Sequence, residues 1–377
     1  MTNPGNHTTL IDLPQTFNIS ETIDMLRAIL AIWVLFTHTI PWARIMQGDV
    51  SVPASVSWVM QMLTRVFQPV SETHPAVLGF IVLSGYCIHR NGLRRGESNI
   101  LQYAIRRAFR IYPVYLLAII AGIICYHIAF SFDPQHTRML SGTKDLNHFY
   151  LVAKVIGISA FYPSLHASTF QGNAPLHTVM VEIWLYAIYP LGFLFVRRYS
   201  ERVFWIVLSS IWILSMILLS VYPGLHPWWH NGSVMGYLLY WWIGAKFVDT
   251  SFWLRINRFW PYLCLSWLGL SVFLLMGDVA TPFFCEFRKV IFAFLIGLLI
   301  VRLDRLSLSF RLGMNQLGKA GYSIYALHAP VVYTLVIGQV KWWGVALVTI
   351  LLGVFVFWIY ERPLMLIGKR LAHHNIV

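Results

Sequence analysis

Ionisable side chains recur inside the long apolar stretches of this sequence, where they are candidates for chemistry. The first stretch, residues 23–42, contains Asp24, Arg27 and His38. An ionisable group within a membrane helix costs about 2.5–3.5 kcal/mol on insertion scales, so each indicates a function by default. The spacing places Arg27 and His38 on one helix face, about 16 Å apart in depth, with Asp24 one turn from Arg27 as its partner. The spacing alone is equally consistent with an Arg27 that extends to the lipid headgroups and with a His38 whose hydrogen bonds are made inside the core, with no role in chemistry.

A lone carboxylate and a second histidine lie in two later stretches. Glu182 lies near the outer end of stretch 179–197, at a depth comparable to that of His38, which would make a natural partner. His328 follows Tyr325 by one turn in another apolar stretch. A histidine that is oriented by a carboxylate is the usual arrangement for general-base or nucleophilic chemistry. Side chains of these types on separate helices therefore predict a buried reaction centre.

Two arginines one helical turn apart precede the third apolar stretch. Arg107 and Arg110 lie where a helix would enter the membrane from the cytoplasm. Two guanidinium groups so placed can make bidentate bonds to phosphate. Topogenic charge explains the number of arginines here but does not explain their pairing.

A Ser84-Gly85 pair interrupts the second apolar stretch, residues 76–92. Small residues inside a membrane helix permit close approach of another helix or of a ligand. Helix packing is the simpler of these two explanations.

The composition requires a bilayer around the chain. Of 377 residues, 58% are hydrophobic and 11% are charged, whereas a soluble domain has roughly 25% charged residues. The formal net charge of +13 does not indicate nucleic-acid binding, because the basic residues fall in short segments between apolar runs. The sequence contains no cluster of metal ligands, so no metal is predicted.

Apolar stretches of the length that a membrane span needs, about 20 residues, predict an all-α, polytopic helix bundle of about ten transmembrane helices. Residues 146–163 are predicted to form an interfacial or re-entrant segment. The domain organisation is a cytoplasmic segment (1–22), one transmembrane domain (23–363) and a cytoplasmic tail (364–377). The predicted spans are 23–42, 76–92, 111–130, 179–197, 203–221, 233–249, 260–277, 290–303, 321–339 and 342–360.

The basic residues give these spans an orientation. With a cytoplasmic N-terminus, 19 of the 28 Lys and Arg residues fall on the cytoplasmic side and 8 on the other, and Arg27 lies within the first span. The positive-inside rule therefore places both termini in the cytoplasm. We expect a multi-pass protein of the inner or plasma membrane.

Six fragments of the sequence carry a resemblance to a known family. They are residues 24–38, residues 80–86, residues 107–113, Glu182 with Tyr186 and Pro190, residues 322–325 with His328 and Pro330, and residues 361–363. In this order they resemble the membrane-bound acyltransferase family 3, whose members O-acylate sugars, lipids and natural products. Three positions depart from the family pattern. Leu78 and Ile183 replace carboxylates, and His177 replaces a tryptophan.

The resemblance implies a donor, an acceptor and roles for the residues named above. The donor would be cytoplasmic acetyl-CoA or another acyl-CoA, a substrate rather than a permanently bound cofactor, with Arg107 and Arg110 on its phosphates. The acceptor would be a hydroxyl group of a carbohydrate or a lipid-linked glycan. His38 would act as general base or carry the acyl group, with Glu182 orienting it. These implied site residues are completed by Arg27 at the inner mouth and by a pocket of Asp24, Ser84, Tyr325 and His328.

Other functions fit parts of the pattern. The acceptor could be a small natural product instead of a glycan. A transporter or flippase would use the buried charges as a permeation path. That function predicts broken helices in two related halves, and the sequence has no such symmetry. A different membrane-bound acyltransferase fold with an intramembrane histidine would lack the paired arginines.

Overall fold

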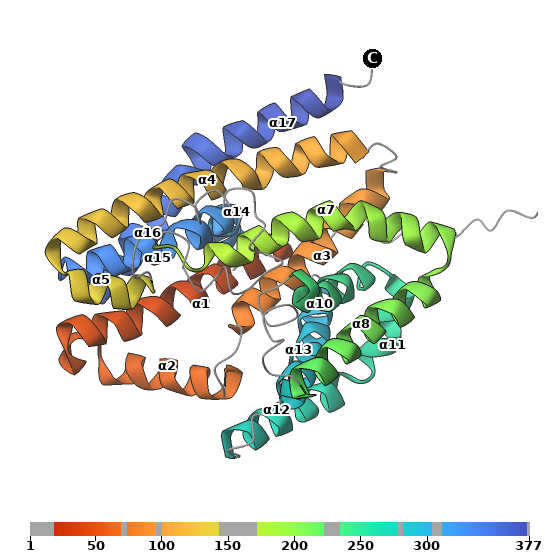
Figure 1. Cartoon of the computed structure of the whole chain (residues 1–377), viewed down its shortest axis with the longest axis horizontal. Coiled ribbons are helices and arrows are strands. Elements are labelled where there is room, and N and C mark those ends of the chain that lie inside the picture. The colour runs from red at the N-terminus through yellow and green to blue at the C-terminus, as the bar shows by residue number, and fades with distance from the viewer. Residues whose placement is uncertain are drawn as a thin grey trace, which may run out of the picture.

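A computed structural model describes residues 19–68, 74–95, 100–142, 172–221, 234–276, 282–303 and 311–374 (Figure 1). Every regular element in these residues is a helix, as predicted for an all-α fold. The helices that hold the candidate site are α1 (Ile19–Gln47), α3 (Pro75–Arg95), α4 (Ile100–Phe132), α7 (Leu176–Arg198), α10 (Val234–Lys246), α14 (Arg311–Lys319) and α15 (Gly321–Ile337). The other elements are η1 (Asp49–Ser51), α2 (Ala54–Phe67), α5 (Pro134–Ser141), α8 (Glu201–Val221), α11 (Thr250–Asn257), α12 (Trp260–Met276), α13 (Pro282–Leu303), α16 (Trp342–Val356), η5 (Phe357–Glu361) and α17 (Arg362–His374).

Each of the ten predicted spans overlaps a helix, but fewer helices are long and apolar enough to cross a membrane. Within the described residues there are four, or five if α11 and α12, bent by 66°, count as one span. The chain is thus a multi-pass membrane protein, while the predicted count of about ten is not confirmed. Helices α10, α12 and α15 have 13, 17 and 17 residues, fewer than the roughly 20 of a full span. The four are Ser20–Gln47, Ile100–Phe132, Leu176–Arg198 and Trp342–His373.

Helix α13 corrects two assignments made from sequence. It begins at Pro282, eight residues before the predicted span 290–303. It therefore includes Arg288 and Lys289, which are only 3% and 4% exposed. Counting these two residues as charges of an outer loop was wrong, because their aliphatic stems and charged ends are packed inside the bundle.

The chain after the last predicted span is also more ordered than a tail. Residues 364–374 of the predicted tail 364–377 continue helix α17, which runs beside α4 (Figure 1). Gly368 makes this approach close, since a methyl group there would overlap the Phe109 side chain. The predicted re-entrant segment 146–163 lies outside the described residues.

Two glycines allow helices α3 and α10 to pack backbone against backbone. A Cβ atom at Gly85 would collide with the carbonyl of Trp241, and one at Gly244 would collide with the carbonyl of Val82. Small residues at such contacts are typical of membrane helix pairs, which lack a hydrophobic driving force between them. The Ser84-Gly85 pair therefore serves helix packing, and it also brings Trp241 next to Ser84.

Helix α3 joins two groups of helices (Figure 1). It packs against α1 and α7 on one side and against α10 and α13 on the other. Helix α1 also packs against α14 and α15, and α4 packs against α7, α15 and α17. Helices α1, α3, α4, α7, α14 and α15 consequently surround one interior space.

Helix α5 turns the chain back after α4, and its ends follow standard capping rules. The Asp133 carboxylate caps the helix by accepting from the backbone N–H of His136, at 3.0 Å, and Gly142 closes it with φ = 64°. The backbone and ring hydrogen bonds from His136 hold the pKa of Asp133 below its usual range. His136 is partly exposed in this contact and does not line the candidate cavity, so it provides a control histidine.

Candidate active site

A small cavity, partly open to the surroundings, lies among these six helices. Its lining combines charged groups with tyrosines and apolar side chains, which is the composition expected of a ligand pocket. Five residues predicted from sequence line it: Arg27, Ser84, Arg110, Glu182 and Tyr325. The other lining residues are Phe80, Ile81, Ile111, Thr178, Val179, Tyr186, Gly318, Lys319 and Tyr322.

A chain of hydrogen bonds ends on the carboxylate of Glu182. The Trp241 indole N–H donates to the Ser84 hydroxyl at 3.2 Å, and this hydroxyl donates to Tyr186 Oη at 3.0 Å. The Tyr186 hydroxyl in turn donates to Oε1 of Glu182. Ser84 is therefore a donor in a chain that supports the carboxylate. In the described part of the chain, Oε2 of Glu182 receives no hydrogen bond, so it can accept one from a ligand.

Arg27 is held by the partner that the helical spacing predicted. Its guanidinium donates to the Asp24 carboxylate at 3.1 Å and to the Cys87 sulfur at 3.4 Å. Gly318 of α14 fits against this turn of α1, because a side chain there would collide with the backbone carbonyl of Asp24. The pair is only partly exposed, with 20% of the Arg27 side chain and 11% of the Asp24 side chain accessible.

Three further cations at the cavity have no carboxylate partner. The guanidinium of Arg107 lies over the rings of Tyr103 and Tyr186, 5.6 and 5.8 Å from their centroids. Among the residues that the structure describes, no carboxylate lies within ion-pair distance of Arg107, Arg110 or Lys319. Arg107 and Arg110 are partly buried, whereas Lys319 is exposed, and partly buried cations are usually paired. Their unmet charge makes this region suitable for an anion.

The two predicted histidines meet each other. The rings of His38 and His328 have centroids 5.1 Å apart and are inclined by 31°. His328 Nδ1 lies 2.6 Å from the carbonyl oxygen of Tyr325. Because a carbonyl only accepts, Nδ1 carries the proton and Nε2 is left as a bare acceptor. Nε2 is buried and has no hydrogen-bond partner among the described residues.

Among the described residues, His38 and Glu182 are not hydrogen-bonded to each other. Glu182 is bonded to Tyr186 in the cavity, whereas the ring neighbours of His38 are Trp42 and His328. The predicted site residues therefore form two groups. Arg27, Asp24, Ser84, Arg107, Arg110, Glu182 and Tyr325 gather at or beside the cavity, and His38 with His328 lies apart from its lining.

Sequence reasoning missed part of the site. Ser323 donates to the buried Glu361 carboxylate at 2.5 Å, and Glu361 lies in the π-helical turn η5, a deviation often found at functional sites. Both residues belong to fragments that carried the family resemblance. Lys319 was counted only as a topogenic charge. No group of three or more metal-ligating side chains occurs among the described residues.

Fold and cavity together define a multi-pass helical membrane protein with excess positive charge beside an internal space. The family model of an acyltransferase domain, acyltransferase 3, matches residues 20–362. The chain therefore belongs to this family, as its six sequence fragments indicated, and it is a membrane acyltransferase. No curated protein and no solved structure matches it.

Proposed function

We propose that this protein transfers an acetyl group from acetyl-CoA to a hydroxyl group of a glycan or glycoconjugate at the membrane. The observation that supports this most is the set of unpaired cations beside an internal cavity. Arg110 and Lys319 line the cavity together with Arg27, which is paired with Asp24, and with a single carboxylate, Glu182. An elongated donor that carries phosphates at one end and a neutral thioester at the other suits this distribution.

The donor would bind with its phosphates at the paired arginines. Arg107 is pre-oriented by the Tyr103 and Tyr186 rings, so little side-chain freedom is lost when it binds an oxyanion. Arg110 and Lys319 would add charge-assisted contacts. The pantetheine arm would then extend past Tyr186 toward Glu182, where the cavity contains the remaining polar groups.

The reaction centre would use the imidazole of His38. In direct transfer, His38 takes the proton of the acceptor hydroxyl, whose oxygen attacks the thioester carbonyl. The carbon–sulfur bond breaks, and the CoA thiolate leaves and is protonated, which releases an ester and CoA. In the covalent route, His38 carries the acyl group before the hydroxyl attacks. His328 Nε2 would accept a hydrogen bond from the hydroxyl or from protonated His38, and Glu182 would fix the substrates through its open oxygen.

Binding of acetyl-CoA to the detergent-purified protein tests the donor assignment. The variant Arg107→Ala/Arg110→Ala is expected to bind acetyl-CoA more weakly, since each charge-assisted contact is worth about 1.5–3 kcal/mol. Arg370→Ala, which removes an exposed arginine of α17, is the matched control and should bind like wild type. Unchanged binding by the double variant would return both arginines to a topogenic role. Mass spectrometry of surface glycans from cells with and without the gene tests the acceptor.

The donor assignment requires the arginines to face the cytoplasm. Reporter fusions after Gly96 and after Val377 are expected to report a cytoplasmic location, and a fusion at Gly142 an external one, because the basic residues concentrate on one side. Enzymatic activity of dual reporters in intact cells provides the measurement. An external signal at Gly96 would place the arginines on the face that lacks acetyl-CoA.

A further inference from the structure

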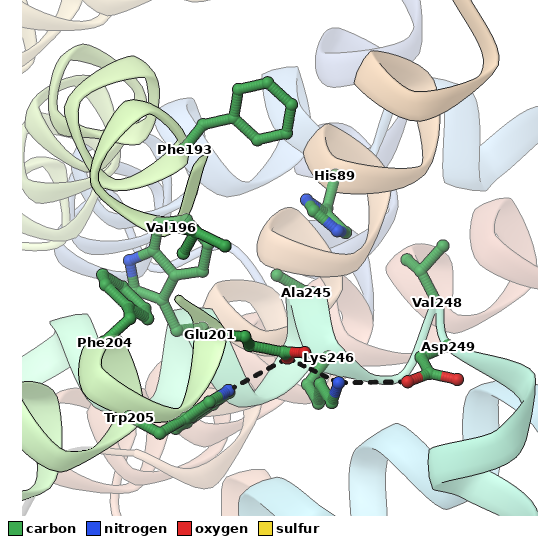
Figure 2. A pocket seen from close by; sticks show the side chains of 11 residues that line it. His89, Phe193, Val196, Glu201, Phe204, Trp205, Ala245, Lys246, Val248 and Asp249 are labelled. Atoms are coloured by element: carbon green, nitrogen blue, oxygen red, sulfur yellow. Dashed lines mark hydrogen bonds and ion pairs between the residues drawn. The ribbon is translucent and has the colours of Figure 1, made fainter. Parts of the chain in front are cut away.

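A second and larger cavity lies at the ends of α3, α7, α8 and α10 (Figure 2). Aromatic rings form much of its wall, among them Phe193, Phe204 and Trp205, which Figure 2 labels. Trp242 completes this wall, with its ring centroid 4.6 Å from that of Phe204. Flat aromatic walls of this kind suit a planar ring, because every heteroaromatic base has a face that can stack.

The polar side of this cavity carries more acceptors than cations. Lys246 lies between Glu201 and Asp249, at 2.5 and 3.0 Å, so its charge is already balanced (Figure 2). The indole N–H of Trp205 donates to Glu201 at 3.2 Å. Both carboxylates remain partly exposed, with 49% of the Glu201 side chain and 38% of the Asp249 side chain accessible. A ligand ring with an N–H donor fits here, and a phosphate group does not.

Touching rings connect this cavity with the unpaired arginine of the candidate site. Tyr189 Oη lies 3.1 Å from Nδ1 of His89, a residue of the cavity wall, and its ring stacks on Trp242 at 5.7 Å. The Tyr189 ring also packs against that of Tyr103, at 5.7 Å, over whose ring the Arg107 guanidinium lies. Along α7, the step from Tyr186 of the first cavity to Phe193 of the second is about 10 Å. The aromatic cavity, the arginine and the first cavity thus follow one another in space.

We infer that the aromatic cavity binds the adenine ring of the acyl-CoA donor, stacked on Trp205 with its exocyclic amine donating to Glu201. This inference rests on the proposed function and extends it. The order of the three features matches the order of the donor's parts: an aromatic base with an amino group, then phosphates, then a neutral arm that ends in the thioester. The basic rim supports the assignment, since Arg197 lies over the Phe193 ring at 4.5 Å and is exposed beside the opening.

Binding of two donors and of a nucleotide fragment to the purified full chain tests this inference. The probes are acetyl-CoA, S-acetyl-pantetheine, which lacks the nucleotide, and adenosine 3′,5′-bisphosphate, which lacks the arm. Trp205→Ala is expected to weaken acetyl-CoA and the bisphosphate by at least about fivefold, the lower range for loss of one base–aromatic stack. Its affinity for S-acetyl-pantetheine should stay within about twofold of wild type.

Two further variants keep the result interpretable. Trp205→Leu retains apolar volume without the flat ring, and it should act like Trp205→Ala if stacking matters rather than packing. Trp343→Ala removes a tryptophan of α16 that is 57% exposed and should leave all three affinities unchanged. Equal weakening of both thioesters, or unchanged binding of acetyl-CoA, by either Trp205 variant overturns the adenine site while the acyltransferase function stands. Absence of acetyl-CoA binding to wild type overturns the proposed donor and the inference together.

Discussion

Two regions of this molecule bury charge, and only one of them leaves charge unmet. In α13, Lys289 lies 2.6 Å from Glu286, which also accepts from Tyr240. Arg288 donates two bonds to the carbonyl of Phe67, both at 3.1 Å. Each charge in this cluster has a protein partner, although Glu286, Arg288 and Lys289 are 6%, 3% and 4% exposed. The charges of the α13 cluster therefore satisfy one another and nearby polar groups without a ligand.

The region around the cavity differs in its charge balance. Arg107, Arg110 and Lys319 have no carboxylate partner among the described residues, and Glu182 keeps one oxygen open. Burial of charge in a membrane protein therefore does not identify a site by itself. An unbalanced set of charges beside a cavity is the better indicator, because a ligand can supply the missing counter-charge.

The largest effect of a single change is expected at His38, which carries the proposed chemistry. His38→Ala should lower turnover by about 10²–10⁴-fold if His38 is the general base, and by more if it carries the acyl group. Protein insertion and acetyl-CoA binding should remain. Turnover per folded molecule, normalised by the size-exclusion profile in detergent, measures this. His136→Ala, at the surface contact with Asp133, should act like wild type.

A second variant examines how the two groups of site residues cooperate. Glu182→Gln preserves shape, and His38→Ala/Glu182→Gln should be little worse than His38→Ala if both serve the same step. Near wild-type turnover of a monodisperse His38→Ala sample would contradict the proposed mechanism. The family membership would be unaffected.

A substitution in the α13 cluster is expected to lower the stability of the protein and to leave its activity unchanged. Lys289→Met leaves the Glu286 carboxylate buried without its cation, which is expected to cost about 3–5 kcal/mol in the free energy of unfolding. Denaturant titration in detergent gives this free energy, and turnover per folded molecule should not change. The double variant Glu286→Gln/Lys289→Met should recover most of the loss, because replacement of a whole buried pair is often neutral. A loss of turnover at full stability would make the α13 cluster part of the site.

The smallest effect is expected in the hydrogen-bond chain behind Glu182. Ser84→Ala removes neutral hydrogen bonds to Tyr186 and from Trp241, each worth about 0.5–1.5 kcal/mol. Turnover should therefore fall by about tenfold or less, as measured in the same assay. A fall as large as that of His38→Ala would instead make the Ser84 hydroxyl a nucleophile.

Sequence reasoning predicted the helices through local rules, and it named several of the residues that line the cavity. The apolar stretches predicted helices because a bilayer requires internally satisfied backbone. Helical spacing predicted the pairing of Asp24 with Arg27, which the structure contains. The predicted count of about ten spans is not confirmed, and hydropathy does not reveal that α10 and α15 are short, with 13 and 17 residues.

The amino-acid sequence by itself determined the membrane helices, the family and the residue types available for chemistry, because periodicity, hydropathy and motif order are local properties. Only the tertiary structure decided which charges are balanced. Arg288 and Arg107 are both arginines at the edge of apolar runs, yet one donates to the Phe67 carbonyl and the other lies unpaired over Tyr103. The difference depends on which distant helices each side chain meets, and such long-range contacts leave no signature in a single sequence.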